Sequence, residues 1–274
     1  MQSQSLRPIA EVKLHPERDA DMRALVISDI HSSLEAFRAV LAVAPPHDVV
    51  WNLGDIVGYG ANPNEVVDLA RRLGGVVVRG NHDRACSGTM HFSEYRELSR
   101  LAAYASGWTQ RVLTNENREW LSRLPQGPVR PIPRKVMCVH GSPWNEDAYT
   151  FLRDDALAAF RSCRARIIFC GHTHWQVGWS WNGTELTPLK PELEPNAGAS
   201  ENQLRLSDRN RYVLNPGSVG QPRDGDWRAA FAVYDDTEAI LTWYRVPYKV
   251  RTAQRKILQA ELPETLATRL RHGA

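Results

Sequence analysis

The chain has 274 residues, of which 42% are hydrophobic, and its 34 Lys and Arg against 31 Asp and Glu give a formal net charge of +3. This balance excludes a disordered chain, and 18 Gly with 17 Pro are too few for a collagen-like one. Basic and acidic residues are interleaved, so neither a nucleic-acid partner nor a membrane partner is predicted. The 4 Cys lack C-x-x-C spacing, and no apolar run approaches the roughly 20 residues of a membrane span. We therefore expect a cytoplasmic protein with reduced thiols.

The polar start of the chain shows no periodicity, so we expect residues 1–21 to form a flexible leader and residues 22–274 a single domain. Within that domain, short runs rich in β-branched residues predict buried strands at 24–27, 49–53, 76–78, 136–139, 167–170 and 212–214. Apolar residues at helical spacing predict helices at 33–44, 64–73 and 154–163, and a longer helical insertion at 93–124. Strands that alternate with helices indicate an α/β sandwich.

The pattern changes after residue 177. Asn182 and Gly183 form a typical hairpin turn, and a stretch rich in Pro, Gly and Asn follows, so we expect a hairpin and loop insertion near 178–212. Residues 230–234 and 240–244 are predicted to form a final antiparallel pair of strands. The tail has the pattern of an amphipathic C-terminal helix interrupted at Pro263, which we expect to pack on the domain rather than to act in catalysis.

Polar residues that commonly bind metals follow the predicted strands directly. They are Asp29, His31, Asp55, Asn81, His140, His172 and His174. Because ligands of α/β sheets collect at the carboxyl ends of the strands, we expect these side chains at one edge. A single Asp-x-His pair occurs by chance in many chains, but recurrence at successive strand ends makes coincidence a poor explanation. Carboxylate, imidazole and amide donors without thiolates suit divalent ions such as manganese, iron, cobalt, nickel or zinc.

The same residues carry a resemblance to a known family. The motifs Asp29-x-His31, Gly54-Asp55, Gly80-Asn81-His82-Asp83, His140-Gly141 and Gly171-His172-x-His174 stand in the order and approximate spacing of the calcineurin-like metallophosphoesterases. The resemblance extends from Arg23 to about Gly220, and the stretches 54–60 and 215–223 are similar to the compact prokaryotic, phosphodiesterase-like branch. It implies a four-layer αββα sandwich of two mixed sheets.

The resemblance also implies roles for the matching residues. One divalent transition-metal ion would be held by Asp29, His31 and His174, a second by Asn81, His140 and His172, and Asp55 would bridge the two. This arrangement leaves open positions for water and substrate. His82 would stand beside the leaving group as general acid. Asp83 is expected to support the turn rather than to bind a metal.

The implied activity is the hydrolysis of a small phosphodiester or nucleotide by attack of a metal-bridging hydroxide. Protein phosphatases of the superfamily carry an arginine shortly after their Gly-Asp pair, whereas Tyr59 and Gly60 stand there in this chain. A phosphodiesterase is therefore more strongly indicated than a protein phosphatase. Arg84 or Arg223 is the candidate to bind the substrate phosphate instead. Loops after Asn81, after His140 and at 178–210 are expected to shape the substrate site.

Other interpretations stay open from the sequence. A symmetrical dinucleoside-polyphosphate hydrolase or a phosphomonoesterase would use the same metal ligands. A non-catalytic, partner-binding scaffold with the same fold is the alternative from another class, although no metal-binding motif has eroded. A DNA-processing nuclease would need a basic groove, which the interleaved charges do not indicate. The hairpin and the C-terminal helix carry no recognisable pairing motif, so no oligomeric state is predicted.

Overall fold

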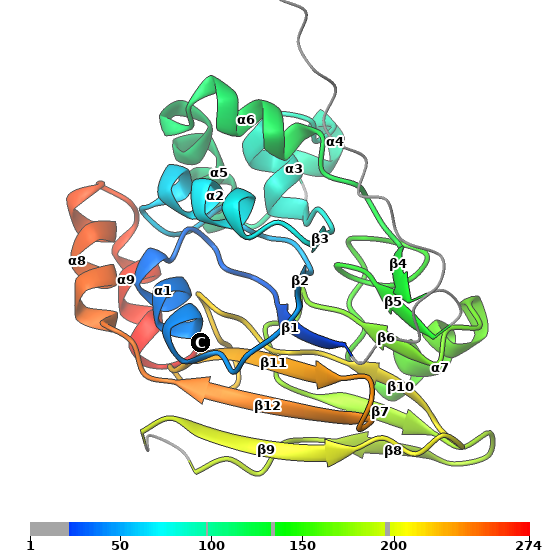
Figure 1. Cartoon of the computed structure of the whole chain (residues 1–274). Helices are drawn as coiled ribbons and strands as arrows, with labels where there is room; N and C mark the ends of the chain where they lie inside the picture. Colours follow the sequence, from blue (N-terminus) through cyan, green and yellow to red (C-terminus); the bar gives the residue numbers. More distant parts are fainter. Residues whose placement is uncertain (1–21, 97, 133–134, 195–197) are drawn as a thin grey trace, which may run out of the picture.

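Two six-stranded sheets form the centre of the computed structural model, which describes residues 22–96, 98–132, 135–194 and 198–274 (Figure 1). The first sheet consists, in spatial order, of β3 (Val76–Val77), β2 (Val49–Asn52), β1 (Arg23–Ile27), β11 (Ala229–Asp235), β12 (Ile240–Val246) and β9 (Ser200–Arg205). The second consists of β4 (Val129–Ile132), β5 (Val136–Cys138), β6 (Ile167–Phe169), β10 (Arg211–Leu214), β7 (Gly178–Trp181) and β8 (Leu186–Leu189). Both sheets are mixed, because parallel neighbours (β1 to β3, and β5, β6 and β10) continue into antiparallel strands.

The central strands are buried on both faces, which explains their continuous apolar sequences. In β1, Ala24 and Val26 pack between the two sheets, whereas Leu25 and Ile27 pack against helices on the outer face. Strand β6 alternates in the same way, with Ile168 in the core on the outer face of the second sheet. This period of two residues is what a pleated strand between two cores requires.

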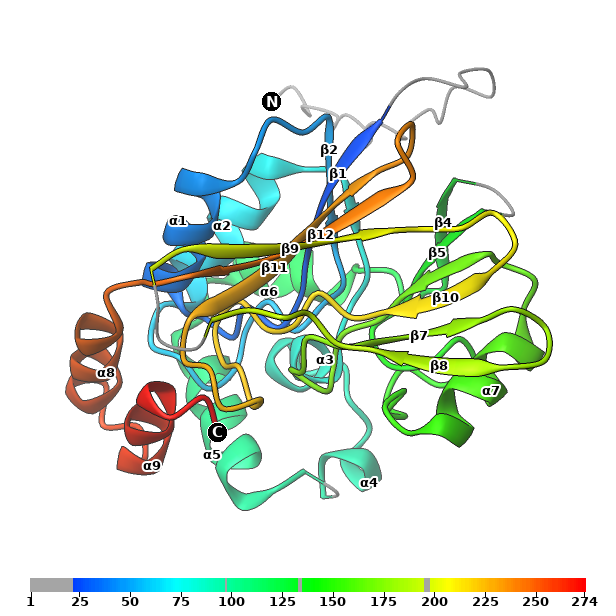
Figure 2. The same cartoon turned by 90° about the horizontal axis from the view of Figure 1, so that it is seen from below.

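The helices cover the outer faces of the sheets, so the fold has four layers (Figures 1 and 2). The core on the first sheet's outer face includes residues of α1 (Leu34–Val43), α2 (Pro63–Leu73), α3 (Asn81–Ser87), α5 (Arg100–Val112), α6 (Asn115–Ser122), α8 (Val250–Gln259) and α9 (Glu264–Thr268). The core of the second sheet's outer face is closed by α7 (Arg153–Ser162). The short helix α4 (Phe92–Tyr95) and the 3₁₀ turn η1 (Arg269–Arg271) complete the helical elements of the described residues.

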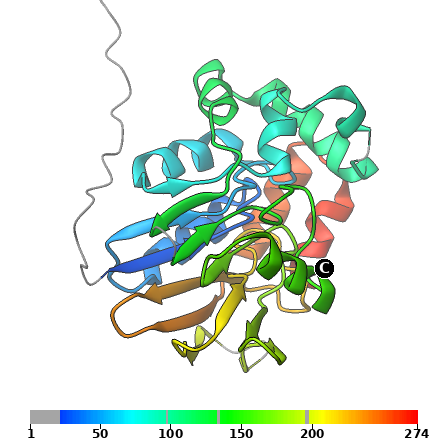
Figure 3. The ribbon, with the colours of Figure 1, turned by 90° about the vertical axis from the view of Figure 1, so that its right-hand side faces the viewer.

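Two helical segments that are far apart in the sequence flank the same end of the molecule. Figures 2 and 3 show α8 and α9 (orange to red) on the same side as α3 to α5 (cyan to green). The tail is interrupted near Pro263, as predicted: α8 ends at Gln259, and Pro263 directly precedes α9. The amide of Gln254 donates to the carbonyl oxygen of Ala267 at 2.8 Å and joins α8 to α9. Lys256 of α8 donates to Asn62 Oδ1 at 3.1 Å, and both helices contribute to the core on the first sheet's outer face, so the C-terminal segment is fixed against the domain.

The structure confirms the four-layer α/β sandwich, the six predicted strands and the hairpin, which is formed by β7 and β8. The insertion after the hairpin is not all loop, because β9 pairs with β12 in the first sheet. Strand β9 alternates between half-buried and exposed residues, and β4 contains Pro131, so neither forms an apolar run. The predicted leader 1–21 lies outside the described residues. Among the described residues, no helix has the length and apolarity needed to cross a membrane.

Candidate metal centre

Strand ends of both sheets deliver polar side chains to one place. Asp29 and His31 follow β1, and Asp55 follows β2. Asn81 opens α3 directly after β3, where Gly80 precedes the helix. From the second sheet, His140 follows β5, and the pair His172 and His174 follows β6. The convergence arises because β1 to β3 are parallel to one another, as are β5 and β6, so that their carboxyl ends meet at one edge.

One group of donors consists of Asp29, His31, Asp55 and His174, which are all buried, with ligand atoms within 4.8 Å of one another. The Nε2 atoms of His31 and His174 lie 3.1 Å apart. The Nε2 atom of His174 lies 3.4 Å from Asp29 Oδ1, and that of His31 lies 3.7 Å from Asp55 Oδ2. An ion with bonds of about 2.1 Å in tetrahedral geometry separates its ligand atoms by about 3.4 Å. The observed separations fit such an ion.

A second group consists of Asp55, His140 and His172, again with ligand atoms within 4.8 Å. The Nε2 atom of His140 lies 3.4 Å from Asp55 Oδ2 and 3.3 Å from Asn81 Oδ1. Asn81 therefore adds an amide oxygen to this group. Because Asp55 belongs to both groups, its carboxylate is placed to bridge two ions. The donors are imidazole nitrogens and hard oxygens, a combination that suits divalent transition metals.

Each of the four clustered histidines has one ring nitrogen within hydrogen-bond distance of a backbone carbonyl. The Nδ1 atom of His31 lies 3.1 Å from the Val57 carbonyl. The Nδ1 atoms of His140 and His174 lie 2.8 Å from the Leu53 carbonyl and 2.6 Å from the Gln221 carbonyl, respectively. His172 is reversed, since its Nε2 atom lies 3.1 Å from the Asp147 carbonyl. A hydrogen bond to a carbonyl fixes the ring tautomer and leaves the other nitrogen as an acceptor. His172 thus offers Nδ1 to a metal, and the other three offer Nε2.

Asp83 holds the loop that carries Asp55. Its Oδ2 atom accepts hydrogen bonds from the backbone N–H groups of Asp55 and Gly80, both at 2.9 Å. Its Oδ1 atom accepts from Ile56 at 2.9 Å and from Val57 at 3.2 Å. Burial raises the pKa of Asp83 to about 7, and the charge of Asp55 acts in the same direction, although the N–H donors favour the carboxylate. Asp83 therefore orients Asp55 without belonging to either donor group.

The charges of the cluster favour a cation. Burial raises the pKa of Asp29 to about 7, an effect that the nearby His140 opposes. Burial lowers the pKa of His140, but the carboxylate of Asp55 outweighs it and raises the pKa of His140 to about 10. A proton on His140 thus compensates the buried carboxylates, and a divalent ion competes with that proton for the same imidazole.

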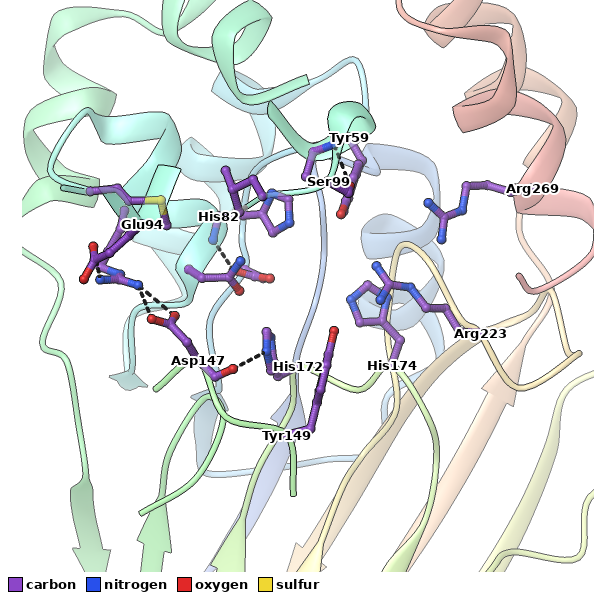
Figure 4. A pocket seen from close by; sticks show the side chains of 16 residues that line it. Tyr59, His82, Glu94, Ser99, Asp147, Tyr149, His172, His174, Arg223 and Arg269 are labelled. Atoms are coloured by element: carbon purple, nitrogen blue, oxygen red, sulfur yellow. Dashed lines mark hydrogen bonds and ion pairs between the residues drawn. The ribbon is translucent and has the colours of Figure 1, made fainter. Parts of the chain in front are cut away.

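A cavity of about 520 Å³ adjoins the donor groups (Figure 4). The ring of His82 faces it and contacts His31 edge-on, with ring centroids 4.9 Å apart. The backbone N–H of His82 donates to Asp55 Oδ1 at 2.8 Å. At Gly58, with φ of +93°, a Cβ atom would lie 2.6 Å from His82 Nδ1, so glycine leaves the space that this ring fills. His82 is thus held between the donor groups and the cavity.

The two arginines that the sequence offers as substrate ligands both line the cavity, but in different surroundings. The Nη2 atom of Arg84 donates to both oxygens of Asp147 at 2.7 and 2.6 Å, and its Nη1 atom donates to Glu94 at 3.1 Å. Arg223 has no carboxylate within ion-pair distance among the described residues, and its Nη2 atom contacts Gln221 Oε1 at 3.3 Å. The guanidinium of Arg223 therefore has fewer hydrogen-bond and ion-pair partners than that of Arg84.

Sequence reasoning missed several residues of the cavity wall, among them Asp147, Tyr149 and Arg269. Tyr149 stacks on the His172 ring, with 4.4 Å between centroids. The sequence indicated this region only as the loop after His140, without singling out Tyr149. Arg269 comes from the tail, which the helical pattern presented only as packing. The expectation for 178–210 is wrong, because no described residue of that stretch lines the cavity. The stretch forms β7, β8 and β9 instead.

A family model described as calcineurin-like phosphoesterase matches residues 22–176. The chain belongs to the calcineurin-like phosphoesterase family. An uncharacterized protein of Methanocaldococcus jannaschii is 36% identical over 248 residues, which cover 89% of this chain and 96% of that protein. The crystal structure of a metallophosphoesterase from Sphaerobacter thermophilus has a TM-score of 0.78 and 37% identity, and the match covers 93% of this chain and 100% of the other.

A shorter similarity involves a nucleotide hydrolase. The symmetrical bis(5'-nucleosyl)-tetraphosphatase of Yersinia enterocolitica is 39% identical over 67 residues, which are 23% of each chain. Membership of the calcineurin-like phosphoesterase family supports a phosphoester hydrolase, and the clustered Asp and His side chains fit a dinuclear metal site.

Proposed function

We propose that the chain hydrolyses a small phosphodiester or nucleotide at a dinuclear metal centre. The proposed ligands are Asp29, His31, Asp55, Asn81, His140, His172 and His174. The observation that supports this most directly is that two compact groups of ligand atoms share the carboxylate of Asp55. Two divalent ions bound there would supply an activated water and offset the charge of the phosphoryl oxygens.

His82 is the proposed general acid. Its ring lies between the Asp55 loop and the cavity, and contact with Tyr59 at 4.4 Å between ring centroids limits its movement. Burial lowers the pKa of His82, and the carboxylate of Asp55 offsets this only in part, so the pKa lies below its ordinary value. A phosphate anion beside the ring favours the protonated form in the same way. The residue would then transfer its proton to the leaving oxygen.

The shape of the cavity supports a small substrate. A volume of about 520 Å³ falls within the range of small-molecule sites. The walls come from α3 to α5, from the loop that carries Asp147 and Tyr149, and from the tail at Arg269. A folded phosphoprotein would have to insert a side chain between these elements, whereas a cavity of this volume suits a molecule of nucleotide size. This geometry favours a phosphodiesterase or nucleotidase over a protein phosphatase.

The first test compares His140→Ala with His47→Ala, a matched control whose ring contacts the Pro45 carbonyl away from the centre. The protein is loaded with Mn²⁺ and tested on an aryl phosphodiester, an aryl phosphomonoester and cyclic nucleotides. His140→Ala should lower turnover at least 100-fold and reduce the bound metal, and His47→Ala should leave both unchanged. Undiminished turnover in the His140 variant would contradict the proposal.

A second test addresses His82 by the nature of the leaving group. His82→Ala should slow the release of a poor alcohol leaving group by roughly 100-fold or more, and the release of an activated phenol far less. Equal losses on both substrates would show that His82 does not transfer the proton. Because the variant keeps all proposed metal ligands, metal analysis should show an unchanged content.

The second candidate function is symmetrical hydrolysis of a dinucleoside polyphosphate, and the 67-residue similarity to the Yersinia enterocolitica enzyme favours it. The products decide between the candidates. Two molecules of ADP from diadenosine tetraphosphate would support symmetrical cleavage, and AMP with ATP would exclude it. A faster reaction on the aryl monoester than on any other substrate would indicate a phosphomonoesterase.

A further inference from the structure

Two arginines from distant parts of the chain meet at one wall of the cavity. Arg223 follows the strand end of β10, and Arg269 lies in η1 at the end of the tail, yet both line the same cavity (Figure 4). The guanidinium carbon of Arg269 lies 5.7 Å from the centroid of the Tyr59 ring. Burial lowers the pKa of Arg269, and the charge of Arg223, which lines the same cavity, acts in the same direction.

Neither guanidinium is neutralised by an acidic side chain. Across the described stretches of the chain, no Asp or Glu carboxylate lies within ion-pair distance of Arg223 or Arg269. The Nε atom of Arg269 donates to an oxygen of Ala274, the last residue of the sequence, at 2.6 Å, which offsets part of its charge but leaves its terminal nitrogens for other partners. Arg223 has a buried Nε atom without a hydrogen-bond partner. Two cations held together at half-buried positions are repulsive unless an anion joins them.

The opposite wall has the reverse charge. Figure 4 shows Glu94 and Asp147 across the cavity from the two arginines. There Arg84 and Arg79 form ion pairs with Glu94, Glu146 and Asp147, so that two guanidinium groups meet three carboxylates. The cavity is therefore cationic at one wall and weakly anionic at the other, with the metal-ligand groups adjoining it. A substrate with several phosphates is drawn to the arginine wall.

We propose that Arg223, Arg269 and Tyr59 form a second anion-binding subsite beside the metal centre, which holds a phosphate of the substrate other than the one hydrolysed. This inference rests on the proposed function and narrows its substrate class to esters that carry a polyphosphate, such as nucleoside or dinucleoside polyphosphates. Arginine forks suit phosphate oxygens, and two of them can clamp one phosphate from two directions. The position after Gly54-Asp55 lacks an arginine in the sequence, but the guanidinium of Arg269 lies over the Tyr59 ring and Arg223 lines the same cavity.

The test measures how strongly the full chain, at a fixed free Mn²⁺ concentration, binds tripolyphosphate relative to orthophosphate. Calorimetry gives the two affinities for the wild type, Arg269→Gln, Arg269→Lys and the control Arg271→Gln. Arg271 lies two residues away, is exposed and does not line the cavity, so the control removes the same charge from the same turn. Thermal unfolding of each variant shows whether the tail remains docked.

We expect Arg269→Gln to lower the ratio of tripolyphosphate to orthophosphate affinity about tenfold, because one charged contact with the distal phosphate is lost. Arg271→Gln should change the ratio less than twofold, and Arg269→Lys should lie between. An unchanged ratio in Arg269→Gln, or an equal fall in Arg271→Gln, would overturn the subsite. If Arg269→Gln does not fold, Arg269→Lys replaces it in the test. An unchanged affinity ratio in Arg269→Lys would then contradict the subsite.

The binding measurement separates this inference from the proposed function. If the wild type hydrolyses no phosphoester but its affinity ratio depends on Arg269, the proposed function fails and the subsite stands. If it hydrolyses an aryl diester and the ratio is insensitive to Arg269, the proposed function stands and the subsite fails.

Discussion

Replacing Asp83 with asparagine tests whether the metal centre depends on a residue that binds no metal. The carboxylate uses both of its oxygens, each of which accepts two backbone N–H groups at 2.9 to 3.2 Å. An asparagine of the same shape has only one acceptor oxygen. In either orientation, its NH₂ group would face two N–H donors and leave them without partners.

The magnitude follows from the two lost hydrogen bonds. A buried hydrogen bond to a charged group contributes roughly 1.5–3 kcal/mol, so Asp83→Asn should lower the free energy of unfolding by about 3 kcal/mol or more. For a chain of this size, that corresponds to a decrease in Tm of about 6–12 °C. Because burial raises the pKa of Asp83 to about 7, the measurement belongs near pH 8.5, where the wild-type carboxylate is charged. Because the loop would be less firmly held, metal binding by Asp55, which both donor groups share, should also weaken.

The assay combines denaturant unfolding, metal analysis and turnover of an aryl diester. Asp155→Asn is the matched control, because one oxygen of Asp155 accepts both of its partners, from Phe151 at 3.1 Å and Leu152 at 2.8 Å. The amide of asparagine can turn its oxygen to the same place, so the control should lose no more than about 1 kcal/mol. If Asp83→Asn unfolds within about 1 kcal/mol of the wild type and retains its metal, the reasoning about this loop is refuted.

Three further predictions follow from the same geometry. Removal of bound metal with a chelator should lower Tm by about 5–10 °C, since a ligand at 100 times its Kd stabilises the native state by about 2.7 kcal/mol, and a Tm that does not respond would argue against a metal centre. Gly80→Ala would place a Cβ atom 2.1 Å from Asp55 Oδ1 and should reduce the bound metal, whereas Gly198→Ala, with no atom within 4 Å, should not. Arg211 donates to three backbone carbonyls at the end of α7 and nearby, so Arg211→Lys should lower the free energy of unfolding by about 2 kcal/mol while diester turnover changes less than twofold.

The convergence of the proposed ligands could be predicted from the sequence, because the ends of buried strands can be located without knowledge of the three-dimensional structure. Asp29 follows β1 and His174 follows β6, so recognising two buried strands was enough to put both at the same edge. The alternation of β1 between two cores likewise follows from an apolar run buried on both faces. These features depend on local pattern and on general rules for packing sheets.

The substrate wall was less predictable, because it depends on how separate elements dock. Arg269 reaches the cavity only because the tail breaks at Pro263 and α9 returns toward α8. The periodic pattern of the tail showed that it packs on the domain, but not which of its side chains reaches the cavity. Strand β9 was missed for a related reason, since its half-exposed alternation carries little apolar signal and its place beside β12 depends on pairing at the sheet edge.

The backbone at the ligands was also beyond sequence reasoning, and it bears on how the centre works. Five of the seven proposed ligands have positive φ angles between 48° and 65°, namely Asp29, His31, Asp55, His172 and His174. Side chains in this region cost roughly 1 kcal/mol or more each, so the surrounding structure must hold them there. It does so through hydrogen bonds between the loops, such as those from the N–H of Asp29 to Gly54 O at 2.9 Å and from that of His31 to Asp55 O at 3.0 Å. The donor positions are thus set by the fold itself, as a preformed metal site would require.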